Sequence, residues 1–86
     1  MVQKLSIPVS VVSRFDHKAR TVMPISLIFD GREYIVTKVG LHHTYRTGRT
    51  LYHVFSVACS GTFFRLVLNT DNLFWILEEV SDGEAD

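Results

Sequence analysis

The chain has 86 residues, enough for one compact domain, and 47% of them are apolar, so the composition is not that of a disordered protein. Cys59 is the only cysteine, which excludes a disulfide within the chain. No window approaches the length of about 18 apolar residues that a membrane-spanning helix needs. The single thiol, and the lack of a signal peptide in residues 1–12, predict a cytoplasmic protein.

The net charge is zero, but the charges are segregated along the chain. Residues 1–69 carry all nine Lys and Arg and three acids (Asp16, Asp30 and Glu33), which gives 9 − 3 = +6. Residues 70–86 carry six acids and no base, which gives −6. This asymmetry indicates either a basic binding surface or an acidic end that shields one, although ordinary solvated strand faces produce the same pattern.

Short alternating apolar runs separated by turn residues predict strands throughout, and no 12-residue window has a convincing helical period. Six strands are expected, at residues 4–15, 22–29, 33–45, 50–59, 62–69 and 73–80. Four of the five connections are short enough to be hairpin loops. We therefore predict an all-β fold, a six-stranded antiparallel meander curled into a small SH3-like or half-open barrel. The barrel spans residues 1–80, and residues 81–86 form a frayed acidic tail.

The turn residues predict the register of the hairpins. Asp30-Gly31 is typical of a type I′ turn, and Ser60-Gly61 and Thr70-Asp71 are expected to form two-residue loops as well. Together these turns place one set of side chains on a shared inner face, which consists of Val39, Leu41, Phe55, Val57, Phe64, Leu66, Trp75 and Leu77. A slip of one residue would turn each strand's set outward, so their agreement supports the prediction.

Two positions need a change of face within a strand. Tyr34 and Val36 belong to the inner set, yet Leu41 has the opposite parity, which predicts a bulge or bend near Thr37-Lys38. The last strand is expected to bend between Leu77 and Val80 for the same reason. Strands that bend in this way allow a small sheet to curl.

The order of these residues resembles a group of uncharacterised bacterial domains. Their pattern runs P-x(4)-W/F-x-G-R-x-Y-x-V, as in residues 24–36 here, and ends in W-x-L-x-x-V-x-D, as in residues 75–82. The resemblance covers roughly residues 7–82, with Phe29 where the group usually has tryptophan and a different segment over residues 40–51. It implies a bacterial domain of unknown function and transfers no catalytic residue. Some members are encoded beside translesion-polymerase-type genes, which implies DNA transactions.

The histidines of the central hairpin are candidates for a metal site. A three-residue loop at Arg46-Thr47-Gly48 would put His43 and His53 on the inner face, about 5–8 Å apart, with His42 pointing outward. Zinc needs at least one more protein ligand, and Cys59 lies about 20 Å further along the strand. No Asp or Glu occurs between residues 34 and 70. We therefore expect structural histidines and no metal or cofactor.

Catalytic arrangements are not evident in the sequence. Cys59 has no neighbouring base to lower its pKa, so a buried structural thiol is expected. Glu78 and Glu79 would point to opposite faces of a strand and could not act as a pair. Phosphate-binding loops and nucleophile elbows are missing. The prediction is a non-enzymatic interaction module of unknown molecular role, with a metal-dependent or small-molecule enzyme as a distant alternative.

The alternative function is single-stranded nucleic-acid binding through residues 42–52. The outer face of the central hairpin and its tip are expected to carry the candidate partner-binding residues Lys38, His42, Arg46, Arg49 and Tyr52. Cations interleaved with aromatic rings suit this ligand, although a protein partner or an ordinary polar face would also fit. The cations of residues 14–20 would extend the surface if the fold brings them near.

A homodimer is also predicted. The reverse face of the last two strands is expected to expose four apolar side chains as a candidate dimer interface, namely Phe63, Val67, Phe74 and Ile76. Strands that are apolar on both faces need a covering layer on each face. The core covers one face, and either the first strand or a twofold partner would cover the other.

Overall fold

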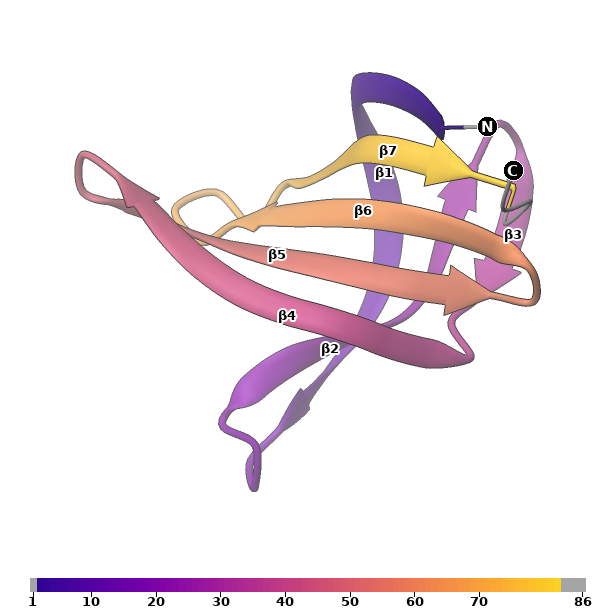
Figure 1. Cartoon of the computed structure of the whole chain (residues 1–86). Coiled ribbons are helices and arrows are strands. Elements are labelled where there is room, and N and C mark those ends of the chain that lie inside the picture. Colours follow the sequence, from indigo (N-terminus) through magenta and orange to yellow (C-terminus); the bar gives the residue numbers. More distant parts are fainter. Residues whose placement is uncertain (1, 83–86) are drawn as a thin grey trace.

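The computed structural model describes residues 2–82, which form seven antiparallel strands and no helix, so none of these residues belongs to a helix that could cross a membrane (Figure 1). The strands are β1 (Val2–Asp16), β2 (Thr21–Phe29), β3 (Arg32–Ile35), β4 (Lys38–Thr47), β5 (Thr50–Cys59), β6 (Thr62–Asn69) and β7 (Trp75–Ser81). They form one sheet in the order β3-β2-β1-β7-β6-β5-β4. The predicted all-β, half-open barrel is confirmed, with seven strands instead of six.

The sheet curls until its two edge strands, β3 and β4, meet at one end. Val36-Thr37 joins them there: the amide of Val36 donates to the carbonyl of Ile25 at 2.9 Å, and that of Thr37 donates to Ala58 at 2.8 Å. The predicted strand at residues 33–45 is therefore two strands, and the break lies one residue before the expected bend. We call this the closed end of the barrel, and at the opposite, open end β3 and β4 diverge (Figure 1).

The core lies on the inner face of the curled sheet. Its buried residues form one cluster, which consists of Leu27, Phe55, Val57, Cys59, Phe64, Leu66, Leu68, Trp75 and Leu77. Phe64 of β6 meets Tyr34 of β3 and Phe29 of β2 edge to face, with ring centroids 4.9 and 6.1 Å apart. Such contacts between aromatic rings add to the burial of apolar surface, so they join the two halves of the sheet across the interior.

Two predicted turns are confirmed in detail. Asp30 and Gly31 have φ values of 56° and 75°, and Ser60 and Gly61 have φ values of 51° and 91°. A type I′ turn requires a positive φ at both central residues, and its twist matches that of the strands it joins. The strand pairing predicted across each turn is also confirmed.

The connection between β6 and β7 is longer than predicted. Leu68 pairs with Trp75 and Leu66 with Leu77, so the predicted pairing of Leu66 with Trp75 is wrong by two residues. A shift of two residues keeps every side chain on its face, and Trp75 and Leu77 are therefore buried as expected. The register shifts again beyond Leu77, where the predicted bend brings Val80 opposite Phe64.

The predicted turn between β4 and β5 is wrong. Gly48 and Arg49 form a two-residue turn with Thr47 opposite Thr50, and a bulge lies between Val39 and Leu41. Gly48 has a φ of 62°, as the first central residue of a type II′ turn does, whereas Arg49 is not among the residues with positive φ. Beyond the bulge the faces of β4 are the reverse of those predicted, and Leu41 is 57% exposed instead of buried.

The four residues of the predicted dimer interface do not form one exposed surface. Val67 is only 4% exposed, and Ile76 is half-buried. Phe63 and Phe74 are 47% and 61% exposed, but Phe63 lies next to the turn between β5 and β6, and Phe74 next to the opposite end of β6. The homodimer stays a prediction. Of the predicted acidic tail, Ser81 belongs to β7, and residues 83–86 lie outside the described residues.

Adjacent phenylalanines of β6 test the assignment of faces. Phe64 is 2% exposed and Phe63 is 47% exposed. Phe64→Ala is expected to lower the free energy of unfolding by about 3–5 kcal/mol because it leaves a cavity in the core. Phe63→Ala should cost about 1 kcal/mol or less. Urea denaturation of both variants measures the difference, and equal losses would contradict the register of β6.

Candidate nucleic-acid interface

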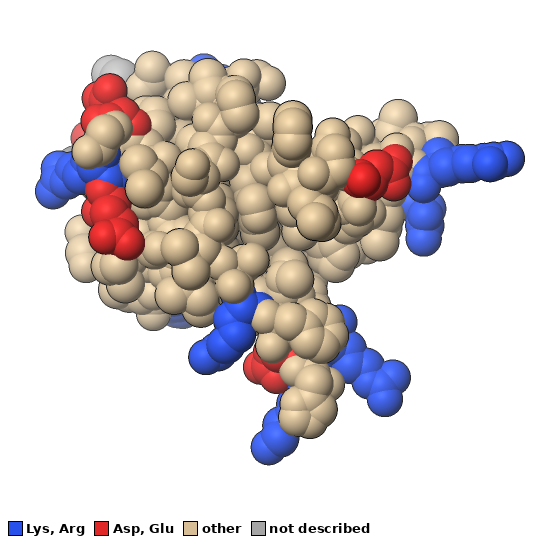
Figure 2. Space-filling model, turned by 180° about the vertical axis from the view of Figure 1, so that it is seen from behind, with Lys and Arg blue, Asp and Glu red and all other residues tan. Residues whose placement is uncertain are grey.

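Two β-hairpins extend beyond the barrel at its open end. The first ribbon, residues 12–22, consists of the end of β1, the start of β2 and the turn between them. The second ribbon, residues 44–52, is the corresponding part of β4 and β5. The ribbons point in different directions, and an open notch separates them in the space-filling view (Figure 2).

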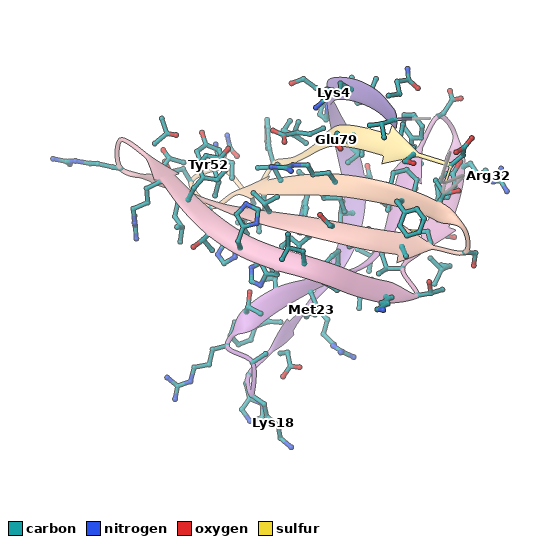
Figure 3. All side chains as sticks on the ribbon, in the orientation of Figure 1. Lys4, Lys18, Met23, Arg32, Tyr52 and Glu79 are labelled. Carbon is teal, nitrogen blue, oxygen red and sulfur yellow. The ribbon has the colours of Figure 1, made fainter. Side chains whose placement is uncertain are left out.

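The ribbons hold most of the basic side chains of the protein. The first carries Arg14, Lys18 and Arg20 and the second Arg46 and Arg49, which are five of the nine Lys and Arg. Positive side chains therefore project on both sides of the notch (Figure 2). The other cations lie elsewhere: Lys4 and Arg32 are far from Lys18 at the tip of the first ribbon (Figure 3).

Few carboxylates neutralise this charge. Asp16 is the only acid within the two ribbons, which gives 5 − 1 = +4. Its Oδ1 accepts the amide hydrogens of Lys18 at 3.0 Å and Ala19 at 3.4 Å, so the carboxylate closes the turn of the first ribbon. Asp71 lies beside the second ribbon, where its Oδ2 accepts the hydroxyl hydrogen of Thr50 at 2.6 Å. The open end of the barrel therefore has a local excess of positive charge.

A groove of about 360 Å³ lies between the roots of the two ribbons. One side is residues 8–11 of β1, which lead into the first ribbon, and the other is residues 73–75. The loop that contains Leu73 is attached to the second ribbon, because the amide and hydroxyl of Thr70 donate to the carbonyl of Leu51 at 3.1 and 2.8 Å. The groove therefore lies where β1 leads into the first ribbon and beside the loop that is joined to the second.

The groove presents apolar side chains to solvent. Leu73 is 70% and Phe74 61% exposed, although both are large. Leu73 has a φ of 64°, a conformation that costs a non-glycine residue about 1–3 kcal/mol. The amide of Leu73 donates to the Asn69 carbonyl at 2.7 Å, and that of Phe74 to Oδ1 of Asn72 at 2.9 Å, so the loop is held in this shape. A loop held under strain with two exposed apolar residues is a candidate binding element.

The histidine pair of the inner face is His42 and His53, not His43 and His53. The register of β4 puts His42 opposite Phe55, and its Nε2 lies 2.8 Å from Nδ1 of His53. The ring of His42 also stacks on Phe55 at 4.3 Å between centroids. His43 faces outward with Val54. Because a nitrogen–nitrogen hydrogen bond needs one donor and one acceptor, the two rings have complementary tautomers.

The surroundings of the histidine pair favour the neutral form of both rings. Burial lowers the pKa of His42, and the nearby His53 and His43 lower it further. Burial also lowers the pKa of His53. Within residues 2–82, no group of three or more His, Cys, Asp or Glu side chains is arranged to hold a metal ion. Cys59 is buried, which raises the pKa of its thiol.

The structure separates the residues of the predicted partner-binding surface. Arg46 and Arg49 lie together on the second ribbon, but Lys38 lies opposite Ala58 near the closed end. His42 is on the inner face, and Tyr52 stacks on Tyr45 of the outer face with ring centroids 4.9 Å apart. The predicted outward placement of His42 is therefore wrong, whereas Lys38 faces outward as expected but lies away from the tip of the hairpin.

The sequence predicts one strand over residues 73–80 and therefore does not reveal the groove between the ribbons. The strand begins only at Trp75, and Leu73 and Phe74 belong to the preceding loop. Asn72 was the available signal, since its side chain forms a turn that interrupts the apolar run. The sequence predicts the cations of the first ribbon only as an extension of the surface on the central hairpin, and the fold places the first ribbon across the notch from the second (Figure 2).

Comparison with known protein families, curated proteins and solved structures finds no match to this chain. The resemblance to uncharacterised bacterial domains stays a prediction from the sequence. The function is therefore inferred from the geometry of the ribbons and the groove.

The neutral histidine pair predicts a pH-dependent stability. Because the pKa values of His42 and His53 are lowered in the folded state, the unfolded state binds more protons as the pH falls below the ordinary histidine value of about 6.5. The free energy of unfolding should be highest above that pH and fall toward about pH 5. His53→Gln should flatten the decrease, measured by urea denaturation across this range. The control is His17→Gln on the exposed first turn, and an unchanged profile in His53→Gln would contradict the assignment.

Proposed function

We propose that the protein is a non-enzymatic interaction module that binds single-stranded nucleic acid across the open end of the barrel. The observation that carries the proposal is the groove with exposed Leu73 and Phe74 between two ribbons that hold five of the nine Lys and Arg. The proposal includes the cytoplasmic location predicted from the sequence, which suits the free, buried thiol of Cys59.

The arrangement suits a flexible polyanion with aromatic bases. Guanidinium groups donate to phosphate oxygens in a forked geometry, and Arg14, Arg20, Arg46 and Arg49 offer four such groups on the two ribbons. A base that stacks on an exposed aromatic ring contributes about 1–3 kcal/mol regardless of its identity, and Phe74 supplies the ring in the groove. The bases of a single strand are free to turn into a groove of this kind, whereas those of a duplex are already stacked.

The zero net charge of the whole chain does not oppose this ligand. Charges further apart than the Debye length, about 8 Å at physiological salt, are largely screened, so the local excess on the ribbons governs the encounter. The carboxylates of Glu78 and Glu79 are engaged with Arg65 and Lys4, at 3.2 and 3.3 Å, on strands outside the ribbons.

The salt dependence of binding tests the role of the ribbons. A fluorescein-labelled 15-nucleotide oligo(dT) or oligo(U) should bind with a dissociation constant well below millimolar at low salt, measured by fluorescence polarisation. Each phosphate contact contributes about 0.7 to the slope of log K against log salt for a single strand. The double variant Arg46→Gln/Arg49→Gln should therefore weaken binding about tenfold at low salt and reduce the slope by about 1.4.

The matched control removes two cations that lie away from the ribbons. Lys4→Gln/Arg32→Gln changes the net charge equally and should leave affinity and slope unchanged (Figure 3). Phe74→Ala should weaken binding about fivefold or more without a change of slope, because it removes stacking and no charge. An equal effect of the control variant, or binding that does not depend on salt, would refute the proposal.

A further inference from the structure

A second groove, of about 270 Å³, lies on the outer face of the sheet near the closed end. It follows the end of β5, between the side chains of β4 and β6. Its principal lining residues are Lys38, Gly40, Ser56, Ala58, Phe63 and Arg65. The register explains their shared face, since Ala58 lies between Lys38 and Phe63, and Ser56 lies opposite Arg65.

The groove exists because three neighbouring positions have short side chains or none. Ser56 and Ala58 form its floor, and Gly40 leaves its β4 side open. The backbone does not require glycine at this position, because Gly40 is not among the residues with positive φ. A Cβ at Gly40 would meet only the carbonyl oxygen of Ser56, at an ordinary 3.5 Å. The missing side chain at Gly40 therefore keeps the β4 side of the groove open.

One wall of the groove is aromatic. The ring of Phe63 is 47% exposed on the outer face, whereas its neighbour Phe64 fills the core. An exposed phenyl ring beside small side chains offers a planar ligand a stacking surface and a floor of methyl and hydroxyl groups.

The charges at the groove favour an anion. Lys38 is exposed and has no carboxylate partner among residues 2–82. The ion pair of Arg65 with Glu78, 3.2 Å long, uses Nε, so its two Nη groups are not engaged by this carboxylate. Glu79, the acid that lines the groove, is 3.3 Å from Nζ of Lys4 (Figure 3). The cation of Lys38 is thus left without compensation beside an aromatic wall.

We infer that this groove binds a small molecule that joins a planar aromatic ring to an anionic group. The ring stacks on Phe63 over Ala58, and the anion meets Lys38 with Arg65 as a second donor. The volume suits one nucleotide or one aromatic carboxylate, and these two sources of the same chemistry are separated by experiment. The inference uses none of the residues of the two ribbons.

Amide chemical shifts of the full chain test the site. AMP and indole-3-acetate are titrated to about 10 mM, with adenosine as the ligand that keeps the ring of AMP and lacks its phosphate. At least one anion should shift the amides of Gly40, Ser56 and Ala58 saturably, with a dissociation constant on the order of a millimolar for so small a ligand. Binding of AMP alone identifies a nucleotide site, and binding of indole-3-acetate alone identifies a carboxylate site. Adenosine should bind several-fold more weakly than AMP at a nucleotide site.

Two variants keep the test independent of any damage to the fold. Gly40→Leu should fill the groove and abolish the shifts, and Lys38→Met, which leaves the groove open, should weaken binding about threefold or more. Oligonucleotide binding by the ribbons should be unchanged in Gly40→Leu, so failure here is distinct from failure of the proposed function. Absence of saturable shifts with both anions, or equal binding to the Lys38→Met variant, would overturn the inference.

Discussion

The barrel depends on the packing of β2 and β3 against the inner faces of β5 and β6. Leu27 is fully buried there, and Phe64 lies between Phe29 and Tyr34. The edge strands β3 and β4 share only the short connection at Val36-Thr37, so side-chain packing, and not a continuous ladder of hydrogen bonds, brings the two halves of the sheet together. A domain of this size has a small core, and the loss of one aromatic side chain is a large fraction of its stability.

The open end of the barrel follows from the same arrangement. Beyond the core, most side chains of the ribbons are exposed. The first ribbon is held mainly by its own backbone bonds, and the second is also joined to the β6–β7 loop through Thr70 and Asp71. Charged and aromatic residues can therefore gather there without a cost of burial. The His42–His53 pair marks the boundary, because its rings stack with Phe55 while its polar atoms satisfy each other. The core end supplies stability, and the ribbon end carries the exposed charged surface.

The sequence predicted faces correctly wherever the turn chemistry was specific. Asp30-Gly31 and Ser60-Gly61 allow one register for the strands that they join. The predicted pairing of β6 with β7 was wrong by two residues, and a shift of an even number of residues leaves every side chain on its face. In β4 the turn at Gly48-Arg49 displaces Leu41 by three residues from its predicted partner, and the bulge near Gly40 reduces the displacement of Val39 to two. The odd displacement exchanged the roles of His42 and His43. The sequence could not predict that the two ribbons lie at the same end of the barrel, because their position arises from the curl of the whole sheet.

The central claim is that the core is more stable against local opening than the ribbons. Native-state hydrogen exchange of the backbone amides measures this difference most directly. The amides of β5 and β6 beside the core, such as those of Phe55 and Leu66, should exchange only through global unfolding. Those of the first ribbon beyond Ser13 should exchange through local opening, at a much lower free energy. Equal protection of the ribbon and the core would contradict the account, because it would require contacts that hold the ribbon against the barrel.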